Sequence, residues 1–549
     1  MLSTAISGLL AFQRALATTS HNITNANTEG YSRQTVSLST RTPQLIGNGY
    51  AGKGVDVTAV NRVYDNFLVT QVNDRTASTN EFEAFHAIAT QIDSTFGNVD
   101  IGLAPAFESF FNSLQDVAND PTSTPARQVL LSEASSLNNK FHTLDKQVVD
   151  LRSGVNKQLE SITTSVNGIA TSIADINKDI ISAKGAAGGG QPNDLLDQRD
   201  VLVRRLAELT DVTTLQQSDG SLNVYIGTGQ SLVLGVSASQ IRSTRNEFDP
   251  TEVEFSLVTG NTVTPITDQL TGGKIGGLLD VRRNLLDTTQ DALGRVAVAL
   301  ANTFNAQHQL GDDLNGNAGG LFFNDVDVSA PAVLPSSNNN PASGTISITI
   351  DDVNQLEVSD YRLSYDGTNY SLLRMSDLSV VDTFTTADFP RTTATEGFTL
   401  NIAGGMASGD KFMIRPVRYA AGNIDLAISD PASFAAAASG NAVGDNSNAL
   451  ALAALQSTNT MGGGTATYLG AYGELVSDVG VKTHQSLVGG EAQRGLLNQA
   501  IDTQQGLSGV NLDEEAANLL KYQQAYQASA RIISVVDTLF QTLISTLGR

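Results

Sequence analysis

The 549-residue sequence predicts a mainly α-helical fold into which β-rich domains are inserted. Apolar residues recur at helical 3-4 spacing at both ends of the chain and over long interior stretches. Strand-like alternation, by contrast, is confined to two interior regions. The length also exceeds the roughly 250 to 300 residues at which a single hydrophobic core stops growing. Several domains are therefore expected, with helices opening and closing the chain.

The first predicted helix carries a narrow apolar seam. Its heptad positions, spaced alternately by three and four residues, are Leu2, Ala5, Leu9, Phe12, Leu16, Thr19 and Ile23. Such a seam fits an amphipathic helix packed on its own domain, or one half of a coiled coil. The other end of the chain favours the coiled coil.

The last predicted helix repeats this spacing almost to the end of the chain. Its seam consists of Leu519, Tyr522, Tyr526, Ser529, Ile533, Val536, Phe540, Leu543 and Leu547. Asn511 is a suitable N-cap, and Glu514 can complete a capping box. Because glycine is absent between Val510 and Gly548, the helix can run about 36 residues, or roughly 54 Å.

The two terminal helices are predicted to pair with each other. A narrow seam cannot be buried by one helix alone, and the stability of such helices comes from packing. Thr19 and Ser529 occupy core positions, so the seams are imperfect. We therefore expect a marginal coiled coil that becomes firm only against neighbouring copies.

The interior alternates between long helices and two β-rich stretches. Helix is expected from about Tyr64 to residue 185, then over 194–210 and 277–309, and again after about 448. The strand patterns lie at 211–270 and 320–420, where Asp219-Gly220 and Asp366-Gly367 are hairpin signals. This nesting predicts a rod with the terminal helices at one pole. The predicted domains are a terminal coiled-coil domain (1–60 with 505–549), a helical rod domain (61–210 with 271–319 and 431–504), a small β insertion (211–270) and an outer β-rich domain (320–430).

Charge and composition exclude several partners. The net charge of −23 disfavours nucleic acid and anionic membrane surfaces, and no basic cluster offsets it. No run approaches the roughly 18 to 20 apolar residues of a membrane span. The first residues lack a basic leader, so a cleaved signal peptide is not expected. The absence of cysteine removes disulfides, thiol catalysis and cysteine-based zinc sites.

The sequence predicts no enzyme active site, no metal site and no cofactor. Gly273-Lys274 lacks the remaining residues of a phosphate-binding loop, and Gly227-Thr228-Gly229 lacks the third glycine of a dinucleotide-binding turn. Residues 313–317 resemble part of a calcium loop but lack its glutamate, and are interpreted as a turn. The histidines show no zinc-binding spacing and are assigned surface or packing roles; they are His21, His86, His142, His308 and His484.

Two terminal motifs resemble one family. Residues 20–31 read SHNITNANTEGY, and residues 508–515 with 522–531 read SGVNLDEE and YQQAYQASAR. They resemble the N- and C-terminal signatures of the flagellar rod, hook and hook-associated proteins. Thr24 is a small departure, since this family often has alanine there. The N-terminal signature residues are Asn22, Ile23, Asn25, Asn27, Gly30 and Tyr31.

Interior motifs point to one branch of that family. Residues 193–200 (NDLLDQRD), 304–308 with 313–316 (FNAQH, DLNG) and 445–450 (DNSNAL) are similar to those of hook-associated proteins at the hook–filament junction. Rod and hook proteins lack them. A hook or distal rod subunit is the alternative within the family. A third hypothesis, an enzyme with a wall-cleaving domain in residues 320–420, has no motif to support it.

The resemblance implies a secreted structural protein that self-assembles into a short tube of about eleven copies. It implies a place between hook and filament, contact with the hook protein and a second junction protein, and a requirement for filament assembly and motility. Export is expected through the flagellar type III apparatus without a cleaved signal. A cognate chaperone is expected on the C-terminal helix. The residues assigned to assembly are Leu2, Leu9, Phe12, Leu16 and Ile23 in the first helix, and Leu519, Tyr522, Tyr526, Ile533, Val536, Phe540, Leu543 and Leu547 in the last.

Overall fold

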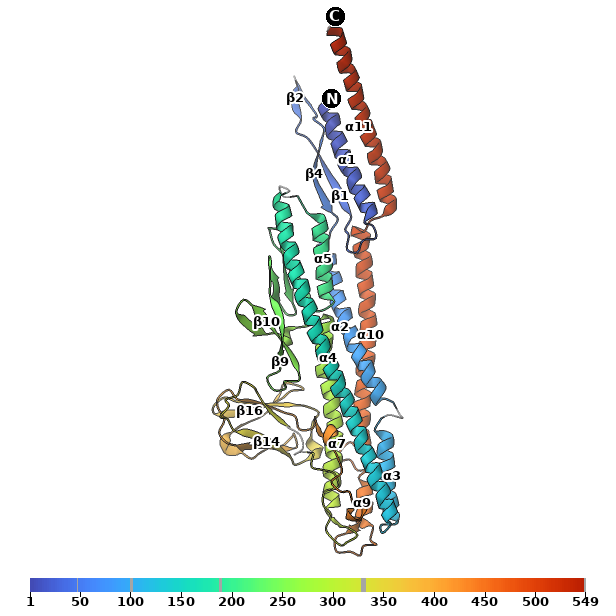
Figure 1. Ribbon diagram of the computed structural model, residues 1–549, viewed down its shortest axis with the longest axis vertical. Helices are drawn as coiled ribbons and strands as arrows, with labels where there is room; N and C mark the ends of the chain where they lie inside the picture. The colour runs from blue at the N-terminus through green and yellow to red at the C-terminus, as the bar shows by residue number, and fades with distance from the viewer. Residues whose placement is uncertain (47, 99–101, 187–189, 327–331, 548–549) are drawn as a thin grey trace.

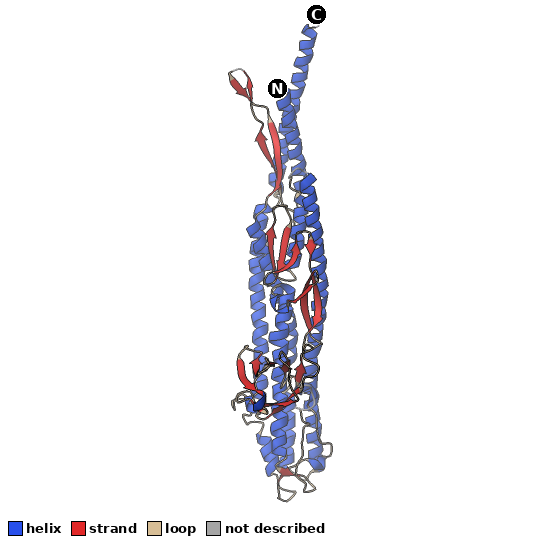
Figure 2. Ribbon diagram, turned by 90° about the vertical axis from the view of Figure 1, so that its left-hand side faces the viewer, coloured by secondary structure: helices blue, strands red, loops and turns tan. Residues whose placement is uncertain are grey.

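The computed structural model describes residues 1–46, 48–98, 102–186, 190–326 and 332–547. The molecule is a long rod with both termini at one pole (Figure 1). Helices run along its length, and the β-rich parts lie along one side (Figures 1 and 2). The predicted fold class, mainly helical with inserted β domains and a helical pole, is confirmed.

The rod is a bundle of long helices. Its helices are α2 (Asn66–Phe96), α3 (Ala104–Asn119), α4 (Thr124–Ala186), α5 (Asn193–Ala207), α6 (Gly273–Val281), α7 (Thr288–His308), α8 (Ala420–Asn423), α9 (Ser447–Ala454) and α10 (Tyr468–Ser508). The apolar face predicted between Leu151 and Ile180 lies within α4, where Val155, Leu159 and Ile173 are fully buried. The stretch predicted as helical from residue 64 to 185 is therefore divided into three helices, α2, α3 and α4.

The helix predicted over 277–309 contains a change of helical type. Its middle, Arg282–Asp287, is π-helical and separates α6 from α7. Single π turns accommodate an extra residue and often occur where function requires it. Here both ends of the π turn supply charged side chains to the interdomain cluster described below.

The small β insertion packs along α4. It has a four-stranded sheet of β5 (Val212–Gln216), β6 (Leu222–Ile226), β7 (Gln230–Leu234) and β8 (Ser237–Ala238), and a three-stranded sheet of β9 (Gln240–Arg245), β10 (Val253–Thr259) and β11 (Thr262–Pro265). Asn177 of α4 bonds both the N–H and the carbonyl of Leu222, and Asn167 does the same for Ile241. Two amides of one helix thus fix the position of both sheets.

The outer β domain has two sheets around a shared apolar core. Five strands follow the order β13 (Val333–Pro335), β20 (Lys411–Ile414), β15 (Tyr361–Tyr365), β16 (Asn369–Arg374) and β17 (Val380–Thr385). Three follow the order β14 (Thr345–Ile350), β19 (Phe398–Ala403) and β18 (Arg391–Thr392). The hairpin predicted at Asp366-Gly367 is confirmed as the β15–β16 turn. Residues 313–317 form the predicted turn, beside the short pair β12 (Gly311–Asp312) and β21 (Ala437–Ala438).

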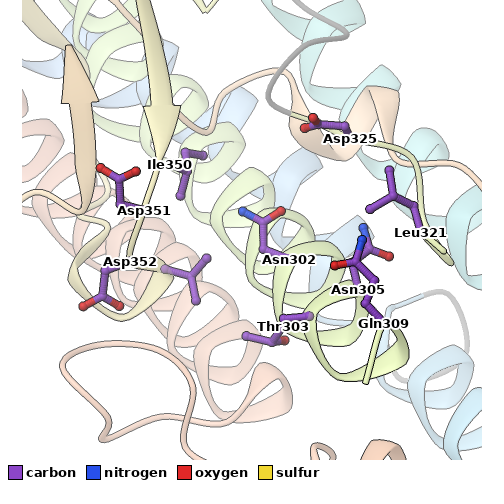
Figure 3. A pocket seen from close by; sticks show the side chains of 11 residues that line it. Asn302, Thr303, Asn305, Gln309, Leu321, Asp325, Ile350, Asp351 and Asp352 are labelled. Carbon is purple, nitrogen blue, oxygen red and sulfur yellow. The ribbon is translucent and has the colours of Figure 1, made fainter. Parts of the chain in front are cut away.

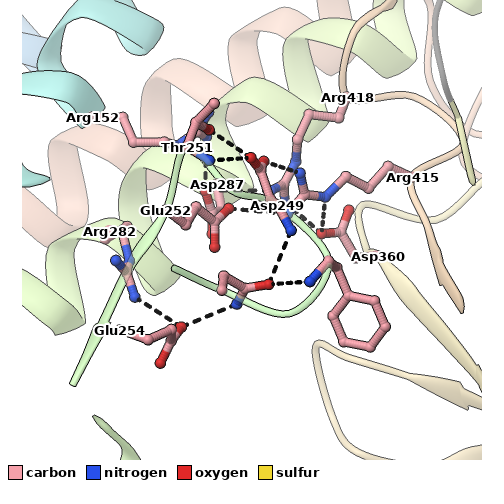
Figure 4. A network of polar contacts seen from close by, with 12 residues as sticks. Arg152, Asp249, Thr251, Glu252, Glu254, Arg282, Asp287, Asp360, Arg415 and Arg418 are labelled. Carbon is pink, nitrogen blue, oxygen red and sulfur yellow. Dashed lines mark hydrogen bonds and ion pairs between the residues drawn. The ribbon is translucent and has the colours of Figure 1, made fainter. Parts of the chain in front are cut away.

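A buried charge cluster joins the rod to both β parts (Figure 4). We call it the interdomain charge cluster. Arg418, 3% exposed, forms a bidentate pair with Asp291 of α7 at 2.8 and 2.9 Å, and contacts Asp360 at 3.0 Å. Arg415 binds Asp249 of the small β insertion at 2.7 Å. The other members of the cluster are Arg152, Glu252, Glu254, Arg282 and Asp287.

The cluster perturbs the titration of its own carboxyl groups. Burial raises the pKa of Asp360 to about 7, even though Arg418 and Arg415 oppose the shift. At Asp287 burial acts in the same direction, but the guanidinium groups of Arg418 and Arg152 outweigh it and hold the pKa below its usual range. The acid groups outnumber the arginines, so one carboxyl remains poorly compensated.

Candidate assembly site at the terminal pole

The terminal pole is an antiparallel pair of α1 (Leu2–Thr24) and α11 (Leu512–Leu547). Two contacts fix its register. Gly8 approaches Ser529 so closely that an added Cβ would lie 3.2 Å from its Oγ. Asn22 bonds Glu515 at 3.1 Å. The prediction that the two ends of the chain pair is confirmed.

Small residues dominate the buried face of α1, which packs on α11 and on the strands β1 (Gln34–Thr40) and β4 (Val55–Arg62). The buried positions of α1 are Ala5, Ser7, Gly8, Ala11, Ala15, Thr18, Thr19 and Asn22. The larger seam residues sit at the edge of this stripe: Leu2 is 46% exposed, and Leu9, Phe12, Leu16 and Ile23 are half-buried. The predicted seam thus marks the correct side of α1, but its large side chains are not enclosed within one copy.

The C-terminal seam divides into two parts. Leu519, Tyr522, Tyr526, Ile533 and Val536 are half-buried, and Ser529 is buried. The register places the start of α1 opposite Val536, so α11 continues for about 11 residues, or roughly 16 Å, past its partner. Phe540 is accordingly 62% exposed and Leu543 54% exposed. Leu547 ends the helix, and its side chain lies outside the described residues.

The start of α11 was predicted correctly. The helix runs from Leu512 to Leu547, 36 residues, and the Asn511 side chain accepts hydrogen bonds from the N–H groups of Asp513 and Glu514. The carboxylate of Glu514 pairs with Arg33 at 2.8 Å. The predicted Asn511 cap is therefore present, whereas the Glu514 carboxylate, which was predicted to complete a capping box, pairs with Arg33 and links α11 to the loop after α1.

A polar joint connects the pole to the rod, and Asn22 lies at its centre. The Asn22 amide donates to the Gln34 carbonyl at 2.9 Å and to Glu515, while its oxygen accepts from Gln34 N–H at 2.9 Å and from Tyr31 Oη at 2.8 Å. Burial raises the pKa of Tyr31 well above its usual range, and the carboxylate of Asp194 adds to the rise. Tyr31 therefore remains a neutral hydrogen-bond donor.

Arg33 closes the joint on the C-terminal side. Its Nε donates to Glu515 at 2.8 Å, and its backbone N–H donates to the Ser508 carbonyl at 2.8 Å. Glu515 is 2% exposed, so this pair is shielded from water. Breaking a buried pair by removing one partner costs about 3–5 kcal/mol. The two termini are thus locked together at the base of the pole.

The α5 motif forms the third side of the joint. Arg62 binds Asp197 at 2.9 Å and Asp200 at 2.6 Å, and the Ser32 N–H donates to Asp197 at 3.0 Å. Gly30, at φ +76°, lies against α5: a Cβ there would come within 2.1 Å of Val201. Three motifs quoted separately from the sequence, at residues 20–31, 193–200 and 508–515, meet here.

The remaining signature residues have local roles. Asn25 ends α1, where its amide donates to the His21 carbonyl at 3.0 Å. Ile23 is half-buried and Asn27 is exposed. Sequence reasoning missed Arg33, Arg62 and Gln34. The position of Arg33 directly after the N-terminal signature was the available signal for a role in this joint. The partners of Arg33 and Arg62 could not be inferred, because they lie far away in the sequence.

A cavity of about 390 Å³ lies in the rod, away from the pole (Figure 3). It lies between α7 and the end of β14, with Asn302, Asp351 and Asp352 on its walls. Asn305 is held by the backbone of Phe323, at 2.9 Å for both its amide and its oxygen. Asn305 therefore has a packing role. Within the described parts of the chain, no three metal-binding side chains gather, and no helix has the length and apolar character needed to cross a membrane.

Family models match four parts of the chain. A model of the flagellar hook-associated protein FlgK helical domain matches residues 89–323, and a D2-like domain model of flagellar hook-associated protein 1 matches residues 334–416. A flagella basal body rod protein model matches residues 2–31, and a FlgEFG C-terminal model matches residues 504–546. The last two cover α1 and α11.

Full-length relatives and a solved structure agree with these models. Flagellar hook-associated protein 1 of Salmonella typhimurium is 35% identical over 558 residues, covering 99% of each chain. The Escherichia coli K12 protein of the same name is 35% identical over 550 residues, again covering 99% of each. The flagellar hook junction protein FlgK from Burkholderia pseudomallei has 27% identity and a TM-score of 0.74, covering 80% of this chain and all of that one.

The rod, its helical pole and the polar joint define a structural subunit of a bacterial flagellar axis. More narrowly, the chain belongs to the flagellar hook-associated protein 1 family. The prediction of a structural role at the flagellar junction is confirmed, and the hook or distal rod alternative gains no support. The protein is located in the flagellum, as a homo-oligomer with flagellar partners.

Proposed function

We propose that this chain polymerises through its terminal pole into a short tube of about eleven copies, placed between the hook protein and a second junction protein. The observation that carries the proposal is the unenclosed apolar surface of the pole. Terminal helices pair through small side chains, and their large side chains remain available to neighbouring copies. The copy number and the two partners rest on family resemblance.

The exposed residues form continuous stripes. On α1, Leu2, Ile6 and Leu10 follow one another at four-residue spacing and are 46, 42 and 56% exposed. On α11, the exposed large apolar residues towards its end are Ile532, Val535, Leu539, Phe540, Leu543 and Ile544. Contiguous apolar surface of this kind marks a protein interaction site. Of the predicted assembly residues, Leu2, Phe540 and Leu543 belong to these stripes.

The free end of α11 suits a second role before assembly. Its last turns extend past α1, so a cognate chaperone can cover Phe540 and Leu543 without disturbing the pair. Export through the flagellar type III apparatus, without a cleaved signal, is proposed with it. Non-enzymatic function and the four domain boundaries given above are further parts of the proposal. The packing role of Asn305 in the cavity supports a non-enzymatic function.

Electron microscopy of a deletion strain tests the proposal. Cells that lack the gene should have hooks, secrete flagellin and grow no filament, and the wild-type gene should restore filaments. A variant with Phe540→Ser and Leu543→Ser should fail to restore them, whereas Leu378→Ser, an exposed leucine of the outer β domain, should succeed. Normal filaments in the deletion strain would contradict the proposal. A pull-down of the chain lacking residues 511–549 tests chaperone binding, which should be lost.

A further inference from the structure

The molecule carries a second projecting apolar feature, a β hairpin beside the pole. Strands β1 (Gln34–Thr40) and β4 (Val55–Arg62) form its stem, and β2 (Gln44–Ile46) and β3 (Gly49–Ala51) form its outer end. Leu45 and Ile46 are 62% exposed and Tyr50 is 75% exposed. Leu45 and Tyr50 are paired across the strands, and the outer end stands clear of the helices (Figures 1 and 2).

The exposed apolar side chains of this hairpin end indicate that another surface binds over them. A two-stranded ribbon is at best marginally stable in water. Tyrosine is among the residues that most often fill a pocket at the centre of a protein interface. We call Leu45, Ile46 and Tyr50 the hairpin anchor.

A groove of about 870 Å³ lies at the joint between pole and rod. It is bounded by the loop after α1, the start of α2, α5 and the end of α10. Its apolar lining residues are Leu68, Val69, Val72, Val201, Ile501, Leu507 and Val510. Leu507 is 47% exposed, so the apolar lining is accessible from outside. We call this the joint groove.

Charge favours contact between these two surfaces. The joint groove is lined by four carboxylates, Glu29, Asp65, Asp200 and Glu514, but by only two arginines, Arg33 and Arg204. Residues 42–55 of the hairpin contain no acidic residue, and their one charged side chain is Lys53. Three of these carboxylates pair with arginines: Glu29 with Arg204, Asp200 with Arg62 and Glu514 with Arg33. The negative charge that the groove offers is therefore that of Asp65, and the weakly basic hairpin end complements it.

A chain cannot fill its own groove. The stem begins at the joint, where the Val63 N–H donates to the Arg33 carbonyl at 2.7 Å. Its outer part is fixed to the start of α1, where the Val55 N–H donates to Ser7 Oγ at 3.2 Å. A Cβ on Gly54 would lie 2.0 Å from the same Oγ, so little movement is possible. The anchor is thus separated from its own groove by most of α1, roughly 25 Å or more.

We propose that the hairpin anchor of one copy inserts into the joint groove of a second copy, displaced along the tube axis by roughly 25 to 40 Å. The contact joins two different surfaces of the same chain, so it is heterologous and repeats around a tube. This inference rests on the proposed assembly of the pole. It adds an outer contact to the apolar contacts of the terminal helices and couples each subunit's joint to its neighbour's hairpin.

Disulfide trapping tests the contact directly, because the natural chain has no cysteine. A strain co-expresses one full-length copy carrying Tyr50→Cys and another carrying Leu507→Cys, and hooks with junctions are isolated and oxidised. A disulfide forms only where the two Cα atoms come within about 7 Å. We expect a crosslinked dimer at least about tenfold above that of the control pair, Tyr50→Cys with Leu378→Cys. Purified unassembled chains should give no dimer above the control.

The outcomes separate this inference from the assembly proposal. Filament-bearing cells whose junctions show no Tyr50–Leu507 crosslink above control overturn the inference and leave the assembly proposal intact. A crosslink from Tyr50→Cys to hook protein or to another position also overturns it. Should either variant fail to assemble, Leu45→Cys with Gln504→Cys probes the same contact from the other strand. If the wild-type chain does not assemble into a tube, both the inference and the assembly proposal are contradicted.

Discussion

The terminal pole and the interdomain charge cluster are opposite solutions to joining parts of one chain. At the pole, large apolar side chains stand in water and small ones make the contact. In the cluster, arginines and carboxylates are buried against one another, and Arg418 alone contacts three aspartates, although Asp360 Oδ1 has no hydrogen-bond partner among the described residues. The cluster is complete within one copy, whereas the pole is incomplete until other copies cover it. The rod is therefore expected to be stable before assembly. The pole buries its large apolar side chains only when neighbouring copies bind.

Energetics support this division. A buried methylene contributes about 0.8 kcal/mol, so a contact made through Ala5, Ala11 and Ala15 is weak compared with one made through leucines. Replacing a member of a desolvated ion pair costs several times more. Substitutions in the cluster should therefore destabilise the monomer more than substitutions at the pole. The effect of substitutions at the pole should also depend on whether the chain is assembled.

The largest effect is expected from the cluster. Arg418→Met leaves Asp291 and Asp360 without their main partner, and should lower the free energy of unfolding of the monomer by about 3–5 kcal/mol. Urea unfolding of the purified chain measures it. Arg391→Met, which breaks the more exposed pair with Asp382, is the matched control and should cost about 1 kcal/mol or less. Equal effects would show that the cluster is not a desolvated network.

The joint should give an intermediate effect. Glu515→Gln weakens the bonds from Arg33 and Asn22 and should destabilise docking of α11 by about 2–3 kcal/mol. Hydrogen exchange at residues 512–530 should accelerate by roughly 30- to 150-fold. Glu514→Gln, at a carboxylate that is 57% exposed, should change exchange only slightly. Equal hydrogen-exchange rates in the Glu515→Gln and Glu514→Gln variants would show that Glu515 does not hold α11 in place.

The cluster should also respond to pH. The pKa of Asp360 in the folded chain, about 7, exceeds the roughly 3.9 of an unfolded aspartate, so the folded state binds the proton more tightly. Stability from this group is present at low pH and is lost as pH rises from about 4 through 7, by at most about 1.4 kcal/mol per pH unit. Burial raises the pKa of Glu81 to about 7 as well. Asp360→Asn should therefore reduce, without abolishing, the fall in stability between pH 5 and 8; an unchanged fall would refute the assignment.

The smallest effect is expected at the contact of α1 with α11. Gly8→Ala gains up to about 1 kcal/mol of helix propensity and loses a similar amount where its methyl meets Ser529. Thermal unfolding followed by circular dichroism should hardly change. Gly8→Leu should instead separate the helices and speed exchange throughout residues 1–24. If Leu were tolerated as well as Ala, small residues would not set the spacing.

What could be predicted from the sequence was local. The Asn511 cap, the 36-residue length of α11 and the Asp366-Gly367 hairpin follow from neighbouring residues. The interdomain charge cluster could not be predicted, since its members are spread from residue 152 to residue 418 without a repeating pattern. The π turn at Arg282–Asp287 was missed because its residues also fit an α-helix.

The candidate site was predicted in part. Heptad spacing located the pairing termini, but it emphasised Leu9 and Phe12 over the small residues that make the contact. The stripe of Ala5, Gly8, Ala11 and Ala15 was legible in the sequence as a sign of close helix approach. The ion pair of Arg33 with Glu515 depends on tertiary folding over almost the whole chain, so no local pattern could predict it.

Hydrogen exchange of the purified monomer, compared with junctions on isolated hook–basal bodies, tests the central claim most directly. Residues 1–8 and 531–546, which lie away from the joint, should exchange rapidly in the monomer and be protected about 100-fold or more after assembly. Residues 155–180 of α4 should be equally protected in both states, because their core is complete within one copy. Equal protection of the pole in monomer and junction would contradict the claim that neighbouring copies complete it.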